Sequence, residues 1–280
     1  MKKILFLVLA ICALAFMLVS CDKGTEGLEF VEINDGEYGV KCGEAVNEGE
    51  IVIPSKHDGK IVTTILSSGF LKCEKLTSIT IPKSITKIEK GAFYGCDSLE
   101  SVYYKGKIKG WCNIEFEHST SNPMSVAKNF YSKNTLANEI KISGTDKINA
   151  YAFFGFECLN KVTIKDVTAI GDSAFAGCSS LSSITLPSGL TSIGKLVFSG
   201  CVKLNSLTIP SSVTIIHPLA FYECTGLKSV AFEDNENWFL AKKETDTKGN
   251  KVVVTDPAQN AKALVKSHAE FWKHRVISNG

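Results

Sequence analysis

Three stretches of the chain repeat one pattern and decide its fold: residues 76–96 read LTSITIPKSITKIEKGAFYGC, residues 181–201 read LSSITLPSGLTSIGKLVFSGC, and residues 204–224 read LNSLTIPSSVTIIHPLAFYEC. Each stretch ends on a cysteine, and these cysteines belong to two runs whose successive members are 23 residues apart. A fixed period of this length indicates stacked structural repeats. The two runs are Cys73 and Cys96, then Cys178, Cys201 and Cys224.

The repeat unit keeps the same residue types at fixed distances from its closing position, which in one copy is Phe156 instead of a cysteine. Isoleucine stands eight residues before that position in every copy, and an aliphatic residue stands six after it. A unit of about 23 residues cannot bury its apolar side alone, so stacked units share one continuous core. Phenylalanine stands three residues before the closing position, at Phe70, Phe93, Phe153, Phe175, Phe198 and Phe221. Leucine stands three residues after it, at Leu76, Leu99, Leu159, Leu181, Leu204 and Leu227.

Within each unit, the segment Leu-x-x-Ile-x-Ile-Pro predicts a short strand with alternate side chains inward. Proline ends three of these strands, at Pro82, Pro187 and Pro210, because it removes a backbone donor. Serine and threonine fill most of the outward positions, which favours an ordinary solvated sheet face. The other interpretation is a flat, weakly charged platform for an extended partner.

The quoted units resemble the BspA-like, Treponema-type leucine-rich repeat, and the resemblance covers about residues 50–232. It implies a leucine-rich-repeat solenoid of α/β-type repeats, with short parallel strands on one face and irregular or short helical returns. It also implies a bacterial surface or secreted protein, and some members of this family are adhesins for host matrix proteins.

The start of the chain predicts export and a lipid anchor. Lys2 and Lys3 precede an uncharged apolar run over residues 4–19, which is too short for an ordinary membrane span. The run ends in Leu-Val-Ser-Cys, which resembles the bacterial lipobox, so we expect Cys21 to be lipidated after residues 1–20 are removed. The alternative is an ordinary signal peptide with an incidental cysteine. Lipid chains would anchor the protein to a membrane face, with the outer membrane or cell surface favoured.

Composition excludes several classes of protein. Hydrophobic residues make up 44% of the 280 residues and charged residues 21%, so the chain can bury a core. The formal net charge of +2 argues against a general nucleic-acid binder. The cysteines lack the short spacing of metal ligands, and one per coil fits a small buried apolar residue. Neighbouring coils bring thiols together, so an oxidising compartment can link some pairs, and Cys42, Cys112 and Cys158 lie off the repeat.

Residues 105–139 interrupt the repeat and form an enlarged coil that either packs or carries a binding site. The alternation of the preceding strand turns the ring of Tyr103 toward solvent. Candidate binding residues are Tyr103, Tyr104, Trp111 and Phe116.

Both ends of the solenoid carry predicted caps. Residues 21–49 hold the anchor and a β-hairpin, in which residues 29–33 and 38–40 flank an Asn-Asp-Gly turn. Residues 233–280 predict a hairpin of residues 238–241 and 252–254, then a helix from Asp256-Pro257 whose apolar stripe reaches Trp272. The rival interpretation of this helix is a membrane- or partner-binding element.

The sequence shows no catalytic motif, metal site or cofactor fingerprint. The leading hypothesis is a non-enzymatic, lipid-anchored surface protein that binds another protein, such as a host matrix protein or a bacterial surface component, and no nucleic acid. The alternative is a periplasmic structural or assembly factor of the cell envelope. A third hypothesis is a hydrolase with its site in the enlarged coil, where Glu115, Glu117 and His118 stand close in sequence.

Overall fold

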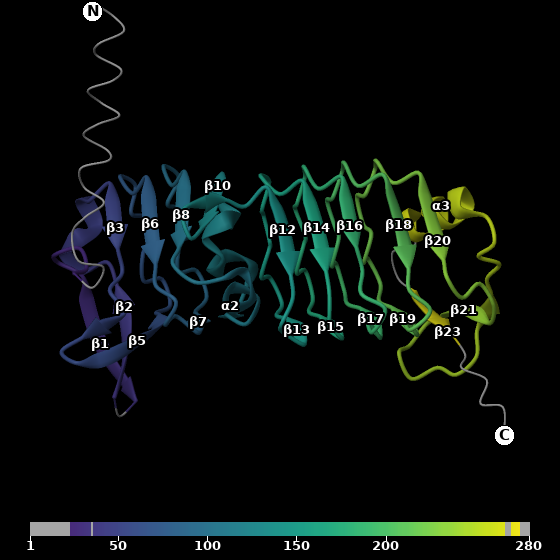
Figure 1. Ribbon diagram of the computed structural model, residues 1–280, viewed down its shortest axis with the longest axis horizontal. Coiled ribbons are helices and arrows are strands. Elements are labelled where there is room, and N and C mark those ends of the chain that lie inside the picture. The colour runs from purple at the N-terminus through teal and green to yellow at the C-terminus, as the bar shows by residue number, and fades with distance from the viewer. Residues whose placement is uncertain (1–22, 35, 267–269, 275–280) are drawn as a thin grey trace, which may run out of the picture.

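The computed structural model describes residues 23–34, 36–266 and 270–274. The predicted signal segment, Cys21 and His268 lie outside these residues. Coils follow one another along the long axis of the molecule, with the described N-terminal part at one end and the C-terminal part at the other (Figure 1). The leucine-rich-repeat solenoid expected from the sequence is therefore confirmed.

The predicted repeat strands form one side of the stack, which we call the front ladder (Figure 1). Their burial alternates, as in β6, where Ile79 and Ile81 are buried while Ser78 and Thr80 are half-buried. This is the period-two pattern that packs one strand face on the core. The front ladder contains β3 (Glu50–Val52), β6 (Ser78–Ile81), β8 (Ser101–Tyr104), β10 (Asn129–Ser132), β12 (Glu139–Ile142), β14 (Lys161–Ile164), β16 (Ser183–Thr185), β18 (Ser206–Ile209) and β20 (Ser229–Phe232).

The returns of the coils hold a second set of short strands, the return ladder, where irregular or short helical segments were expected. Each return of a regular coil carries a polar residue, one variable residue and an isoleucine, as in Thr191-Ser192-Ile193, and β-branched residues favour strands. The return ladder contains β2 (Glu37–Lys41), β5 (Lys60–Ile65), β7 (Lys87–Ile88), β9 (Glu115–Phe116), β13 (Lys147–Ile148), β15 (Ala169–Ile170), β17 (Ser192–Ile193) and β19 (Ile215–Ile216). A two-residue strand, β4 (Lys56–His57), pairs with β5.

The core between the ladders is a stack of phenylalanines and thiols. The ring centroid of Phe175 lies 5.1 Å from that of Phe153 and 6.0 Å from that of Phe198, and the ring planes are nearly parallel. The Sγ of Cys201 donates to the carbonyl of Phe175 in the preceding coil at 3.2 Å. A small side chain with a weak S–H donor fits this place, so the packing role expected of the repeat cysteines is confirmed. Equivalent bonds join Cys96 to Phe70, Cys178 to Phe153 and Cys224 to Phe198.

The N-terminal end carries the predicted hairpin. Strands β1 (Glu29–Asn34) and β2 pair antiparallel, and β2 pairs in parallel with β5, so the hairpin extends the return ladder. A 3-10 helix, η2 (Gly43–Asn47), follows it and leads into β3.

The C-terminal end differs from the expectation in two details. The hairpin partner of β21 (Trp238–Ala241) is β22 (Asn250–Lys251), and the backbone N–H of Val252 still donates to the carbonyl of Trp238. Helix α3 (Pro257–Lys266) starts as predicted, with the Asp256 carboxylate accepting from the N–H groups of Ala258 and Gln259. The expected extension of its apolar stripe to Trp272 is wrong. Trp272 lies in β23 (Phe271–His274), which pairs antiparallel with β19 and β21 and buries the indole.

The enlarged coil breaks both ladders. After β8 the chain forms α2 (Ile108–Cys112), β9, two 3-10 turns η3 (Ser119–Ser121) and η4 (Pro123–Ser125), and then β10. The next strand, β11 (Thr135–Leu136), turns back and pairs antiparallel with β10. The front ladder ends at β11 and restarts at β12, and the return ladder ends at β9 and restarts at β13. A second interruption, between β16 and β18, leaves the return strands β17 and β19 paired.

Candidate binding surface

A row of outward side chains crosses the front ladder on the N-terminal side of the break. Val52 pairs with Thr80, Thr80 with Tyr103, Tyr103 with Tyr131, and Tyr131 with Leu136. Directly paired residues point to the same face of a sheet, so these five side chains form one row, the tyrosine row. Val52 is 38% exposed and Leu136 is 37% exposed, so its apolar ends reach solvent.

Two tyrosines form the centre of the tyrosine row. The rings of Tyr103 and Tyr131 stack with centroids 4.7 Å apart and planes inclined by 14°. Both are half-buried. Side chains stand roughly perpendicular to a sheet, so the two rings support each other and present their phenol ends outward. The outward orientation predicted for Tyr103 is confirmed, and this pair is rigid aromatic surface of the kind that anchors protein partners.

The other three candidate binding residues lie in the core, so their expected role as surface contacts is wrong for this structure. Tyr104 is 2% exposed, Trp111 is fully buried and Phe116 is 4% exposed. Tyr104 occupies an inward position of β8, one residue after Tyr103, and its burial raises the pKa of the phenol to about 12. Phe116 occupies the isoleucine position of its return strand, where it pairs with Ile88. The packing alternative for the enlarged coil therefore holds for these side chains.

Trp111 is buried at the joint between the two halves of the solenoid. Its ring lies 4.6 Å from that of Phe130 and 6.1 Å from that of Phe156, which belong to the two sides of the break. Its Nε1–H donates to the carbonyl of Ala152 at 2.6 Å. The indole therefore joins the two halves of the solenoid by both packing and a hydrogen bond.

Side-chain amides replace strand pairing at the same joint. The Nδ2 of Asn122 donates to the carbonyls of Tyr151 and Ala152, at 2.8 and 3.0 Å. The Nδ2 of Asn149 donates to the carbonyls of Asn113 and Ile114, at 3.0 and 3.1 Å. These bonds satisfy backbone groups that a ladder would otherwise pair. They give the enlarged coil a fixed shape, which holds the tyrosine row in place.

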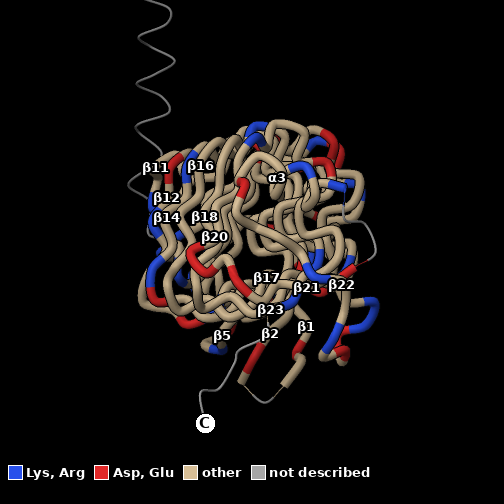
Figure 2. Tube along the Cα trace, turned by 90° about the vertical axis from the view of Figure 1, so that its right-hand side faces the viewer, with Lys and Arg blue, Asp and Glu red and all other residues tan. Residues whose placement is uncertain are grey.

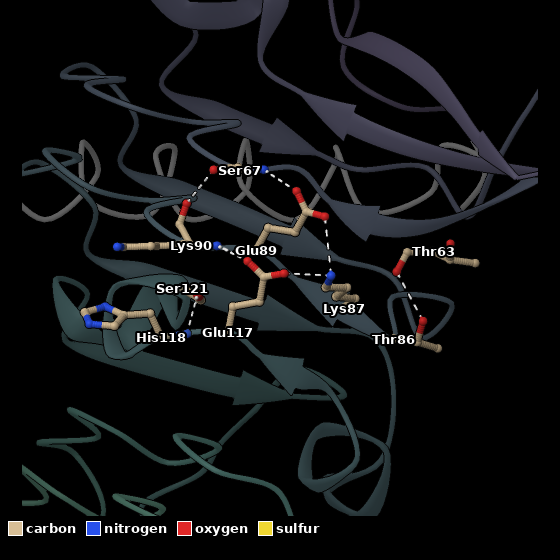
Figure 3. Close-up of polar contacts among 9 residues, drawn as sticks. All are labelled: Thr63, Ser67, Thr86, Lys87, Glu89, Lys90, Glu117, His118 and Ser121. Carbon is tan, nitrogen blue, oxygen red and sulfur yellow. Dashed lines mark hydrogen bonds and ion pairs between the residues drawn. The ribbon is translucent and has the colours of Figure 1, made fainter.

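A polar groove of about 740 Å³ runs across the return ladder beside the N-terminal hairpin, with Glu37, Thr64, Lys87 and Glu115 among its lining residues. One of its charged residues, Lys87, is engaged within the protein (Figure 3): its Nζ lies 2.7 Å from the Glu117 carboxylate and 3.5 Å from that of Glu89. The ion pair with Lys87 lowers the pKa of Glu117, and the backbone N–H of Lys90 also donates to this carboxylate. These groups brace adjacent coils.

The acidic residues and histidine considered for hydrolysis do not converge. Glu117 is bound to Lys87, whereas the Nδ1 of His118 accepts from the backbone N–H of Thr120 and caps η3. The backbone N–H of His118 donates in turn to the Ser121 hydroxyl (Figure 3). This geometry gives His118 a local structural role.

Burial makes several of the thiols poor nucleophiles, whereas a hydrogen bond from Cys73 lowers the pKa of Cys96. Burial raises the pKa of the Cys112 and Cys224 thiols to about 12, and burial together with a hydrogen bond to Cys73 raises that of Cys42 to about 12. Within residues 23–34, 36–266 and 270–274, no cluster of three or more His, Cys, Asp or Glu side chains is placed to hold a metal ion. No helix in that part of the chain is long and apolar enough to cross a membrane.

Comparison with known proteins identifies the repeat. The pattern described as the BspA type leucine rich repeat region matches six copies, over residues 50–134 and 146–241. The fold is similar to that of a leucine-rich repeat protein from Bacteroides ovatus, with 25% identity and a TM-score of 0.52. That match covers 75% of this chain and 53% of the other, so the chain spans about half the length of that protein. No curated protein matches the chain.

Two further solved structures are more distant. A leucine rich cell surface protein from Faecalibacterium prausnitzii shares 16% identity over 78% of this chain and 96% of its own, with a TM-score of 0.37. The Treponema pallidum leucine rich repeat protein shares 21% identity over 75% of this chain and 70% of its own, with a TM-score of 0.29.

Sequence reasoning missed Tyr131 and Leu136 as members of the tyrosine row. Both lie in the segment without a visible repeat, so nothing in the periodicity assigned them to strands. The signal that could have found them is the local pattern Asn129-Phe130-Tyr131-Ser132, which alternates as β8 does, followed by Lys133-Asn134 as a turn. Both turn residues adopt positive φ, at 50° and 65°.

Proposed function

The chain belongs to the BspA-type leucine-rich-repeat family, and from this premise we propose that it is a non-enzymatic, lipid-anchored surface protein that binds another protein. The partner is a host matrix protein or a component of a bacterial surface. Binding occurs by surface complementarity on the rigid front ladder, and the enlarged coil adds specificity.

The tyrosine row is the observation that carries this proposal. Its two apolar ends are exposed, its centre is an aromatic pair, and the enlarged coil beneath it is fastened by buried hydrogen bonds. Tyrosine supplies a large contact area at a low cost in conformational entropy, so such surfaces favour protein partners.

Residues 1–20 supply the proposed export signal, and Cys21 the thiol that takes the lipid. A single lipidated cysteine would hold residues 21–49 at a membrane face, the solenoid of residues 50–232 beyond it, and the cap of residues 233–280 at the far end. The outer surface is the location that adhesion requires.

Protease treatment of intact cells tests the location first. Loss of the protein while the envelope stays closed supports surface display. Full protection until the outer membrane is opened would exclude direct adhesion and favour the alternative, a periplasmic structural or assembly factor.

Binding to a panel of purified extracellular-matrix proteins tests the surface. We expect saturable binding that Tyr103→Ala and Tyr131→Ala weaken about tenfold, with Tyr94→Ala, an exposed tyrosine outside the row, as the control. Equal affinity for all three variants and the unchanged protein would contradict the choice of the tyrosine row. Turnover in a substrate panel that His118→Ala abolishes would instead support the hydrolase hypothesis.

A further inference from the structure

The break in the front ladder leaves one edge of β12 without a strand partner. In the described residues β12 pairs only with β14, and the neighbouring sheet ends at β11. The carbonyls of Asn138 and Ile142 accept from the N–H groups of Lys161 and Lys165 in β14 and just after it. Backbone groups of a strand in a parallel ladder alternate between its two edges, so those of Glu139 and Lys141 point to the free edge.

An unpaired strand edge is a template for another polypeptide. Its N–H and C=O groups are spaced to match an extended backbone, which no glycan or lipid headgroup reproduces. The side chains of Glu139 and Lys141 are exposed, whereas Ile140 and Ile142 face the core. Helix α2 lies near β12, so an added strand has to fit beside it, while Ile140 and Ile142 keep their places in the core.

Exposed lysines surround this edge. Lys105, Lys133 and Lys165 occupy equivalent places at the carboxyl ends of β8, β10 and β14, where each N–H donates to the carbonyl closing the preceding strand. Lys141 and Lys161 lie on the outward face of β12 and β14. We call these five residues the central lysines, and Figure 2 shows Lys and Arg segments along the side of the molecule that carries β11, β12 and β14.

The positive charge at the break is only partly balanced, because Glu139 lies directly opposite Lys161 on the same face of the sheet. None of the central lysines forms an ion pair in the described part of the chain, although Lys87 on the return ladder binds two glutamates. Within four residues in sequence, the acidic neighbours of the central lysines are Glu139, Glu157 and Asp166. The same end-of-strand position holds Pro82, Pro187, Pro210 and Glu233 in other coils, so this basic row is confined to the middle of the molecule.

We infer that the break is a docking site for an extended, acidic segment of a partner protein, which adds as a strand to the free edge of β12 while its carboxylates contact the central lysines. This inference rests on the proposed protein-binding function and names the chemistry of the partner. The unpaired backbone selects a polypeptide, and the unpaired lysines select acidic side chains. The tyrosine row adjoins the site through Leu136 of β11.

The test measures binding of a fluorescent peptide that alternates glutamate with threonine, using its lysine–threonine counterpart and heparin as comparisons. We expect the acidic peptide to bind, and its affinity to fall between about 0.05 and about 0.5 M sodium chloride. Combined Lys133→Glu, Lys141→Glu and Lys161→Glu substitutions should weaken binding roughly tenfold or more. The control reverses three exposed lysines elsewhere, Lys203, Lys228 and Lys248, so it has the same net charge and should bind normally.

A matched pair of substitutions at Glu139 tests strand addition separately from charge. Glu139→Gln keeps the free N–H and removes a negative charge, so it should strengthen binding of the acidic peptide. Glu139→Pro removes the same charge and also the N–H at the free edge, at the first residue of a strand, where proline is tolerated. We expect it to weaken binding below that of Glu139→Gln, and circular dichroism checks that the variant is folded. Methylation of alternate backbone nitrogens in the peptide gives the same test without changing the protein.

Equal affinities of the Gln and Pro variants, or of the methylated and unmethylated peptides, would overturn strand addition. Binding of heparin alone would overturn a protein partner in favour of an acidic polysaccharide. Failure of the acidic peptide, with binding to matrix proteins still sensitive to Tyr103→Ala, would refute this site while leaving the proposed function intact.

Discussion

The regular coils and the enlarged coil solve the same packing problem by different means. In the coils of β14, β16 and β18, repeated phenylalanines and thiols fill the core, and return strands pair from coil to coil. In the enlarged coil, one indole and two asparagine side chains take over both tasks. A repeated core tolerates the loss of one member because its neighbours are alike, whereas a joint built from single side chains depends on each of them.

The largest predicted loss of stability follows from removing the Trp111 side chain at the joint. Trp111→Ala should lower the free energy of unfolding by about 3–5 kcal/mol, because it opens a cavity between the halves and removes one of the two side-chain hydrogen bonds to the Ala152 carbonyl. Denaturant titration followed by circular dichroism measures it, and we expect the transition to split as the two halves uncouple. Trp111→Phe keeps most of the ring and should lose less. A single sharp transition with wild-type midpoint would refute the role of this joint.

The second prediction compares the stability lost with a buried and with an exposed side-chain hydrogen bond between neighbouring coils. Asn122→Ala should cost about 1–3 kcal/mol, because the Asn122 side chain is fully buried and serves the carbonyls of Tyr151 and Ala152. Thr191→Ala removes an exposed hydroxyl that bonds the Thr168 carbonyl, so it should cost under about 0.5 kcal/mol. Thermal unfolding of both variants measures the two losses of stability. Similar losses for Asn122→Ala and Thr191→Ala would contradict the greater importance of the buried bonds.

Thiol labelling compares the two regions without a mutation. Cys158 is half-buried near the joint, whereas Cys201 is fully buried in a regular coil, and burial raises the pKa of both thiols. We expect iodoacetamide at neutral pH to label Cys158 slowly and Cys201 only after unfolding, because the thiolate is the reactive form. Mass spectrometry of the native and unfolded protein measures the labelling. Faster labelling of Cys201 would mean that the regular coils open more readily than the joint.

The smallest effect on stability is expected at the ion pair between Lys87 and Glu117 on the return ladder. Lys87 lowers the pKa of Glu117, so this carboxylate stabilises the folded state above its unfolded pKa and loses that contribution as the pH falls through its folded value. Both side chains are about one-third exposed, so Glu117→Gln should cost under about 1 kcal/mol. Stability measured at neutral and acidic pH should show the difference between variant and wild type shrinking in acid. A constant difference would contradict the ion pair as its cause.

Periodicity predicted the front ladder well and the enlarged coil poorly, for a physical reason. A residue such as Phe198 is recognisable because five equivalents occupy the same place, and its burial follows from the stack. Trp111 has no equivalent, and an aromatic residue among polar neighbours fits a binding loop as well as a core. Only the long-range contacts with Phe156 and Ala152 show that it is buried.

The candidate binding surface was also predictable only where the repeat pattern extends. Strand alternation correctly turned Tyr103 outward and should have excluded Tyr104, which occupies an inward position. The pairing of Tyr103 with Tyr131 joins a regular strand to a residue near the end of the enlarged coil. Helix α3 could be predicted at its start from local capping chemistry, but β23 depends on pairing with a distant coil.

The C-terminal cap has a consequence for how far assembly can proceed. A column of nearly identical coils invites another molecule to continue it end to end, and an open head-to-tail contact of this kind grows into a fibre. Here the last return strand, β19, pairs with β23, which runs antiparallel to it. The Nδ2 of Asn260 in α3 donates to the Val230 carbonyl, which would otherwise accept from a further coil. We therefore expect this end to disfavour the end-to-end addition of a second molecule, which leaves the side of the solenoid as the surface for partners.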